Sequence, residues 1–151
     1  MRKSLIAAAV LTAAATLVTV AAARPLSTKQ RLSIMVKNSS FVLTPMSSGA
    51  IQGDSGKFDA CCWSLRHVLR SGQQLDVNNP LLTLTGKNGI LKLRNRIVWV
   101  DLPGGWSIFT GTWKVVGGTG AYAGLSGHGS DAAAVPPRGD GKVHFWGFLS
   151  K

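Results

Sequence analysis

The sequence lacks the patterns that mark several common classes of functional site. Glutamate is absent, and all six acidic residues are aspartates. The three histidines stand far apart, without the spacing of metal ligands, and no Gly-x-Ser-x-Gly elbow presents a nucleophilic serine. No long Lys/Arg block forms a nucleic-acid-binding arm, and no long amphipathic helix is indicated. These absences predict no metal, no cofactor and no specific nucleic-acid partner, and they favour a protein that is not an enzyme.

The N-terminus has the three parts of a secretory signal peptide. Met1-Arg2-Lys3 is basic, residues 5–20 are apolar, and Ala21-Ala22-Ala23 is a small-residue cleavage site. An uncleaved anchor is the alternative, although the apolar run is short for a membrane span. We expect a secreted, extracellular protein whose mature chain has no transmembrane segment. The expected domains are a signal peptide at 1–23, a linker at 24–30 and one β-barrel domain at 31–151.

Positive charge dominates the composition. Seventeen Lys and Arg residues against six Asp give a formal net charge of +11 at pH 7. A surface this basic attracts polyanions, such as an anionic polymer of the cell envelope. The simpler alternative is that the charge keeps an exported protein soluble. Arg94 and Arg96 are accordingly either candidate anion-binding residues or part of a solvated basic face.

Apolar and polar residues alternate with period two from Arg31 to the C-terminus, which is typical of half-buried β-strands. Asn88-Gly89 is a strong hairpin signal, and other turn residues recur at near-regular intervals. This pattern predicts an all-β fold, either an antiparallel barrel or a sandwich. The expected strands are 32–36, 41–43, 58–65, 68–77 with an interruption at Ser71-Gly72, 81–84, 90–102, 109–115, 126–135 and 143–149.

The longest run, 90–102, separates two faces most clearly. Side chains alternate across a strand, so residues two apart share a face. The apolar set is expected to face the core and the basic set to face outward. The apolar set is Leu91, Leu93, Ile97 and Trp99, and the basic set is Lys92, Arg94 and Arg96.

The segment GTWKVVGGTGAYAGLSGHG at 111–129 contains seven glycines. Gly118-Thr119-Gly120 imitates a dinucleotide-binding fingerprint, but such a loop must open a helix whose N-terminus holds the phosphates. The glycines that follow cannot sustain that helix. Glycine instead suits a place where the backbone takes positive φ and strands cross closely. The segment therefore predicts a barrel corner, with structural turn residues Gly117, Gly118, Gly120 and Gly124.

This segment also resembles a strand-turn-strand pattern of the allene oxide cyclase and dirigent β-barrels, which runs Gly-Thr-aromatic, Gly-Gly-Thr-Gly-x-Tyr-x-Gly and Gly-x-Gly. It looks most like that of the small secreted bacterial members of this group. The resemblance implies an eight-stranded, calycin-like antiparallel barrel with an apolar central cavity, which frequently forms homo-oligomers in plants. Allene oxide cyclases rely on a cavity glutamate, which this chain lacks.

Cys61 and Cys62 are the chain's only cysteines, and they are adjacent. Consecutive strand residues point to opposite faces, so the pair cannot hold one metal from a regular strand. Three possibilities remain open. The two residues form a vicinal disulfide, they bridge different protomers, or one thiol is buried while the other is exposed.

The sequence supports three functional hypotheses. The leading one is non-enzymatic binding of a small apolar or aromatic molecule in the barrel mouth or interior. The alternatives are dirigent- or cyclase-like steering of a reactive substrate, and binding of a cell-envelope polymer or other polyanion through the basic surface. Aromatic side chains and one histidine are the candidate ligand-binding residues, although most aromatics could equally belong to the core. These candidates are Trp63, Trp113, Tyr122, His144 and Trp146.

Overall fold

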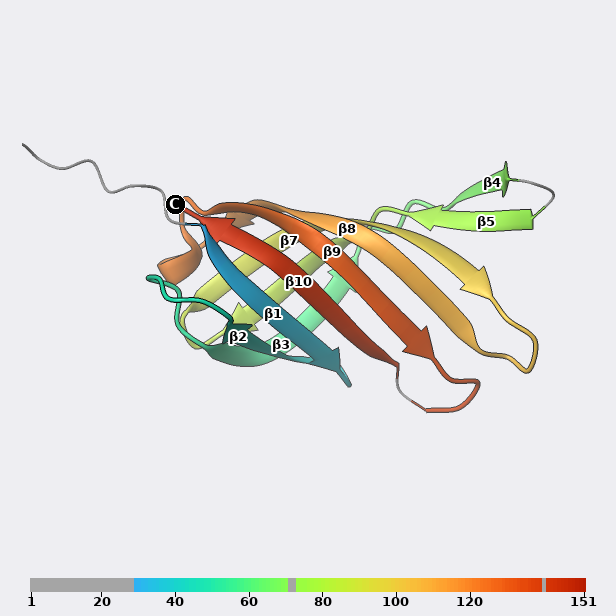
Figure 1. The fold of residues 1–151 in the computed structure, drawn as a ribbon, viewed down its shortest axis with the longest axis horizontal. Coiled ribbons are helices and arrows are strands. Elements are labelled where there is room, and N and C mark those ends of the chain that lie inside the picture. The colour runs from blue at the N-terminus through green and yellow to red at the C-terminus, as the bar shows by residue number, and fades with distance from the viewer. Residues whose placement is uncertain (1–28, 71–72, 140) are drawn as a thin grey trace, which may run out of the picture.

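The computed structural model describes residues 29–70, 73–139 and 141–151 (Figure 1). The predicted signal peptide, residues 24–28 of the predicted linker and the Ser71-Gly72 interruption lie outside these residues. The elements within them are β1 (Gln30–Lys37), β2 (Ser40–Pro45), β3 (Asp54–Cys61), β4 (Arg66–Arg70), β5 (Gln73–Asn78), β6 (Leu81–Gly86), β7 (Gly89–Asp101), β8 (Ser107–Gly118), the short 3-10 turn η1 (Gly120–Tyr122), β9 (Ser126–Val135) and β10 (Lys142–Ser150).

Eight of the strands close an antiparallel barrel. Hydrogen-bonded neighbours follow the order β7-β6-β3-β2-β1-β10-β9-β8, and β8 pairs again with β7. Closure pairs both edges of every strand in this ring. The predicted all-β barrel of eight antiparallel strands is therefore confirmed. No helix among the described residues is long and apolar enough to cross a membrane.

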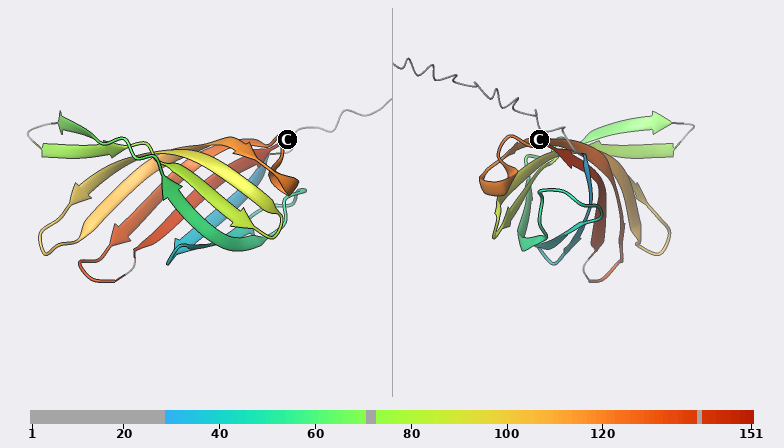
Figure 2. Two further views of the ribbon diagram at one scale, coloured as in Figure 1. Left: turned by 180° about the vertical axis from the view of Figure 1, so that it is seen from behind. Right: turned by 60° about the vertical axis from the view of Figure 1, so that its left-hand side comes forward.

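The strands β4 and β5 form a hairpin outside the ring, which we call the hairpin arm. Three pairs, Asp76↔Trp99, Val77↔Val98 and Asn78↔Ile97, join β5 to the last part of β7. Figures 1 and 2 show the arm standing away from the barrel. The sequence pattern predicts one interrupted strand at 68–77, whereas the chain forms two paired strands there.

The predicted strand at 58–65 is wrong at both ends. β3 begins at Asp54 and ends at Cys61, and residues 62–65 form no strand. Cys62 has φ +61°, in the left-handed region that residues with a side chain rarely adopt. Extended pairing with β6 therefore stops at Cys61↔Leu81, and the chain leaves the barrel toward the hairpin arm.

The core lies inside the barrel, where the inward side chains of the strands meet. Leu91, Leu93 and Ile97 of β7 are buried as their spacing predicts, while Trp99 is only half-buried and stacks on Phe109 with ring centroids 5.2 Å apart. The buried cluster comprises Leu32, Ile34, Val36, Phe41, Leu43, Ile51, Leu82, Leu84, Leu91, Leu93, Trp113, Tyr122, Phe145 and Leu149.

The glycine-rich segment turns one corner of the barrel. β8 ends at Gly118, η1 makes a single turn, and the chain enters β9 at Ser126. Gly120 has φ +59°, and a side chain there would also collide with the carbonyl oxygen of Asn88. Glycine is thus required at this position both for backbone conformation and for the close approach of the β6–β7 turn. Gly124 likewise has positive φ, +71°.

Candidate functional site

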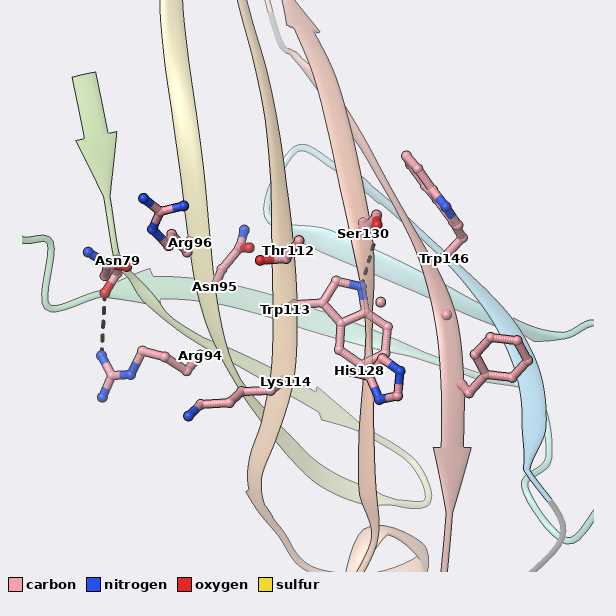
Figure 3. A pocket seen from close by; sticks show the side chains of 13 residues that line it. Asn79, Arg94, Asn95, Arg96, Thr112, Trp113, Lys114, His128, Ser130 and Trp146 are labelled. Carbon is pink, nitrogen blue, oxygen red and sulfur yellow. Dashed lines mark hydrogen bonds between the residues drawn. The ribbon is translucent and has the colours of Figure 1, made fainter. Parts of the chain in front are cut away.

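A groove runs over the outer surface of β7, β8, β9 and β10 (Figure 3). Its volume is about 730 Å³, within the range of small-molecule sites. We call it the outer groove. The charged, histidine and exposed aromatic side chains that line it are Arg94, Arg96, Lys114, His128, Trp146 and Phe148.

Period-two alternation and strand register together bring these residues onto one face. Arg94 lies opposite Lys114, Lys114 opposite His128, and His128 opposite Phe148 in successive strand pairs. Phe148 in turn lies opposite Arg31 of β1. With neighbouring strands about 4.8 Å apart, this row of five side chains extends roughly 20 Å across the sheet.

Two glycines shape the floor of the groove. Trp113 points into the barrel and is 2% exposed, with its indole N–H donating to the carbonyl of Ser130 at 3.1 Å. Side chains at Gly129 or Gly147 would collide with the Trp113 ring. The two glycines therefore leave room inside the barrel for the indole ring, which packs directly beneath the floor of the groove.

Aromatic rings form one side of the groove. Trp146 is 43% exposed, and its ring centroid lies 5.3 Å from that of His144. His144 is held in place by Ser33, whose Oγ lies 2.8 Å from Nε2. Phe148 is also partly exposed and lies beneath the guanidinium of Arg31, 6.0 Å from the ring centroid. This side offers flat apolar faces to a ligand.

Cations form the opposite side. Arg94, Arg96 and Lys114 all project outward from β7 and β8 and are exposed. Arg94 Nη1 donates to the carbonyl of Asn79 at 3.4 Å, a contact that leaves most of its guanidinium available. None of the described residues that line the groove is acidic. The site can thus hold an anionic group opposite an apolar ring.

A polar pair lies inside the barrel beneath this sheet. Asn95 and Asp131 are 2% and 1% exposed, and Asn95 Nδ2 donates to Asp131 Oδ2 at 3.3 Å. Asn95 Oδ1 and Asp131 Oδ1 have no hydrogen-bond partner among the described residues. Burial raises the pKa of Asp131 to about 6, against the opposing effect of the single hydrogen bond from Asn95.

A second buried carboxylate, that of Asp54, lies at the end of the barrel formed by the glycine-rich segment. Asp54 accepts hydrogen bonds from the backbone N–H of Ser55, Lys87 and Asn88 and from the hydroxyl of Tyr122, at 2.8 to 3.2 Å. Burial works to raise the pKa of Asp54, but these bonds outweigh it and hold the pKa below its ordinary value. Burial first, and then the bond to Asp54, raise the pKa of Tyr122 above its ordinary value.

The structure brings together some of the residues that the sequence singles out and separates others. Trp113, Trp146, Arg94 and Arg96 border the outer groove. His144 contacts Trp146 in an adjoining hollow on the same face.

Four further candidate residues lie elsewhere. Tyr122 is buried at the glycine-rich end, and Trp63 is 56% exposed on the segment that leads to the hairpin arm. The two cysteines form a vicinal disulfide, and both are exposed.

The sequence analysis does not predict Lys114, His128 and Phe148 as groove residues. It also does not predict that Asn95 and Asp131 form an interior pair. The signal for the first three is the same period-two phase that places Arg94 and Arg96 outward. Asn95 is in phase with the buried Leu91, Leu93 and Ile97, which marks it as an inward polar residue. Its partner, Asp131 of β9, is set by how β7 and β9 align across β8. That alignment cannot be predicted from a local sequence pattern.

The comparisons with known proteins found no matching family model, and none found a significant match among curated proteins or solved structures. The resemblance to allene oxide cyclase and dirigent barrels, together with the activities that it implies, therefore stays a prediction. The function of the chain has to be argued from the outer groove itself.

Proposed function

We propose that this protein is a non-enzymatic binding protein whose outer groove takes an anionic polysaccharide. The proposal rests on one observation. Three cationic side chains and two aromatic rings line the same groove of about 730 Å³; they are Arg94, Arg96, Lys114, Trp146 and Phe148. Arginine guanidinium groups match carboxylate or phosphate with paired hydrogen bonds. Indole and phenyl faces suit the apolar faces of sugar rings.

The shape of the charged surface supports a polymer as the ligand. The row from Arg94 through Lys114, His128 and Phe148 to Arg31 crosses five neighbouring strands. Its extent of roughly 20 Å exceeds a single sugar ring and accommodates several linked units. The formal net charge of +11 adds long-range attraction for such a polymer.

The test is a titration of the protein with a polyuronic acid, monitored by tryptophan fluorescence and calorimetry, alongside a neutral polysaccharide of equal length. We expect saturable binding of the polyuronic acid only, weakening as salt rises. The double variant Arg94→Gln/Arg96→Gln should weaken binding at least about tenfold, since each charge-assisted hydrogen bond contributes about 1.5–3 kcal/mol. Trp146→Ala should weaken it about threefold to tenfold through lost ring contact.

A matched control variant removes the same charge elsewhere. Lys37 and Lys142 are exposed cross-strand neighbours on β1 and β10, outside the outer groove. Lys37→Gln/Lys142→Gln should retain most of the affinity. Equal losses of affinity in the two double variants would show that binding depends on net charge and not on the groove. Tighter binding of a single-stranded oligonucleotide than of the polyuronic acid would replace the proposed ligand by a nucleic acid.

A small aromatic or apolar molecule is the second candidate ligand. It is favoured by the groove volume and by the exposed rings of Trp146 and Phe148 in the lining. A set of aromatic carboxylates should then quench tryptophan fluorescence at one molecule per chain, with Trp146→Ala removing the response. If these carboxylates quench the fluorescence and the polyuronic acid does not change it, the ligand is a small aromatic molecule.

A further inference from the structure

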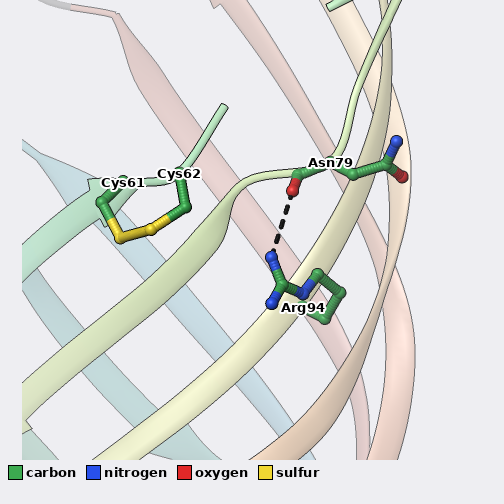
Figure 4. The surroundings of a disulfide bond; sticks show 4 residues. All are labelled: Cys61, Cys62, Asn79 and Arg94. Atoms are coloured by element: carbon green, nitrogen blue, oxygen red, sulfur yellow. Dashed lines mark hydrogen bonds between the residues drawn. A yellow bond between two sulfur atoms is a disulfide. The ribbon is translucent and has the colours of Figure 1, made fainter. Parts of the chain in front are cut away.

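The Cys61–Cys62 disulfide lies where the barrel joins the hairpin arm (Figure 4). Cys61 is the last residue of β3 and pairs with Leu81, while Cys62 is the first residue outside the strand. Both cysteines are exposed, so a thiolate from solution can reach either sulfur. The bond links neighbouring residues and cannot brace distant segments, in contrast to a disulfide that closes a long loop.

The backbone beside the disulfide has an unusual conformation. Among the described residues other than glycine, positive φ occurs at Asn38, Ser39 and Cys62. Asn38 and Ser39 form the two-residue turn between β1 and β2, where positive φ is the expected geometry. Cys62 lies in no such hairpin turn. Cys62 is instead bonded to its neighbour Cys61, and without that bond negative φ is the conformation that a residue with a side chain favours.

The bend at Cys62 sets the path of the chain toward the outer groove. Residues 62–65 lead from it into β4, and Leu65 and Arg66 border a hollow of about 440 Å³ shared with Arg96. At the other end of the arm, the carbonyl of Asn79 accepts the hydrogen bond from Arg94. Figure 4 shows this bond close to the disulfide. Arg94 therefore contacts one segment that joins the arm to the barrel, and Arg96 borders a hollow lined by both joining segments.

We propose that the Cys61–Cys62 disulfide is a reversible redox site for low-molecular-weight thiols, and that its reduction loosens the hairpin arm beside Arg94 and Arg96. In the first step a thiolate attacks one sulfur, forming a mixed disulfide and breaking the Cys61–Cys62 bond. A second thiolate then attacks the small molecule's sulfur in the mixed disulfide. The small disulfide leaves, two electrons have passed to the protein, and the protons of the two thiols end on Cys61 and Cys62.

The redox step is tested with reduced and oxidised glutathione on the purified full chain. After equilibration, alkylation and mass spectrometry should find no free thiol in the oxidised buffer and two in the reduced buffer, with return on reoxidation. Hydrogen exchange in 62–70 and 73–80 should be at least about tenfold faster in the reduced protein, with β9 and β10 unchanged. A disulfide that glutathione does not reduce, or equal exchange in both states, overturns the proposal.

The variant Cys61→Ser/Cys62→Ser separates loss of the bond from any other effect of the thiol reagent. Its arm should exchange as fast as that of the reduced protein and should not respond to glutathione. A response of the arm to glutathione in this variant would place the effect outside the disulfide and overturn the proposal.

The consequence for the groove rests on the proposed function. Affinity for the polyuronic acid should fall about threefold or more on reduction, and equally in the double-serine variant, because a loosened arm no longer fixes Arg94 and Arg96. Equal affinity in both redox states overturns this coupling. If neither state binds the polymer, the proposed function fails, whereas thiol counting and hydrogen exchange still decide the redox site.

Discussion

Two buried aspartates in the same barrel have opposite environments. Asp54, at the glycine-rich end, is 7% exposed and accepts four hydrogen bonds. Asp131, farther inside, is 1% exposed and accepts one long bond from Asn95. The pKa of Asp54 is lowered, and that of Asp131 is raised to about 6. The comparison shows that depth of burial and the number of hydrogen-bond donors together decide whether a carboxylate in this barrel is held charged.

The difference has a structural meaning. The donors to Asp54 come from three separate segments: the start of β3, the β6–β7 turn and η1. One carboxylate therefore fastens together parts of the chain that lie far apart in sequence. Asp131 joins only β9 to β7, and it introduces a polar group into an interior that is otherwise mostly apolar. Asp54 should stabilise the fold, whereas ionised Asp131 should destabilise it.

The largest expected effect is that of Asp54→Ala. This change leaves three backbone N–H groups and the Tyr122 hydroxyl without their acceptor, and it should lower the free energy of unfolding by about 4 kcal/mol at pH 7. The measurement is denaturant-induced unfolding followed by tryptophan fluorescence. Asp59→Ala is the matched control, since Asp59 is an exposed aspartate of β3 whose ion pair with Lys57 should contribute less than about 1 kcal/mol. Similar losses in the two variants would contradict the role given to Asp54.

The next largest effect is expected from Asp131→Asn. At pH 8 this nearly isosteric change removes a buried charge, and the free energy of unfolding should rise by about 2 kcal/mol. At pH 4, where Asp131 is neutral in the folded protein, the same change should have an effect below about 0.5 kcal/mol. Unfolding curves at the two pH values provide the measurement. An equal effect at both would show that the charge of Asp131 is not the cause.

The pH dependence of the wild-type protein's stability tests the direction of this effect. The folded-state pKa of Asp131, about 6, lies above its ordinary value of 3.8, so the folded chain binds this proton more tightly. The resulting stabilisation is complete below about pH 4 and is lost as the pH rises through about 6. Asp54 acts in the opposite direction, because its stabilisation is present above its ordinary pKa and is lost as the pH falls below about 4. Asp131→Asn should remove the first dependence and leave the second.

The smallest effect is expected from Tyr122→Phe. The ring stays in the core, and only the hydroxyl that donates to Asp54 at 2.8 Å is removed. Because the three backbone donors remain, the loss should be about 1–1.5 kcal/mol at pH 7. Its check is a double-mutant cycle with Asp54→Ala, in which removing the hydroxyl should cost less once the carboxylate is gone. Full additivity in that cycle would show that the bond does not couple the two residues.

Much of the fold can be predicted from the sequence, because period-two alternation is a local signal. Residues 90–102 illustrate this, since Leu91, Leu93 and Ile97 are buried while Arg94 and Arg96 project outward. The end of β3 cannot be predicted in this way. The apolar pattern continues to Leu65, but the backbone at Cys62 takes positive φ and stops the strand. The backbone conformation of one residue thus ends a strand that the residue pattern predicts to continue.

Local patterns in the sequence are enough to predict the alternating strands, the excess of positive charge, the adjacent cysteines and the glycine-rich corner. Contacts between distant segments cannot be predicted in this way. Lys114, His128 and Phe148 join Arg94 and Trp146 in one groove, Asn95 bonds to Asp131, and Tyr122 bonds to Asp54. The physical reason is that alternation tells which face of its own strand a residue occupies. Register and barrel closure, which are set by pairing between distant segments, determine which residues share that face.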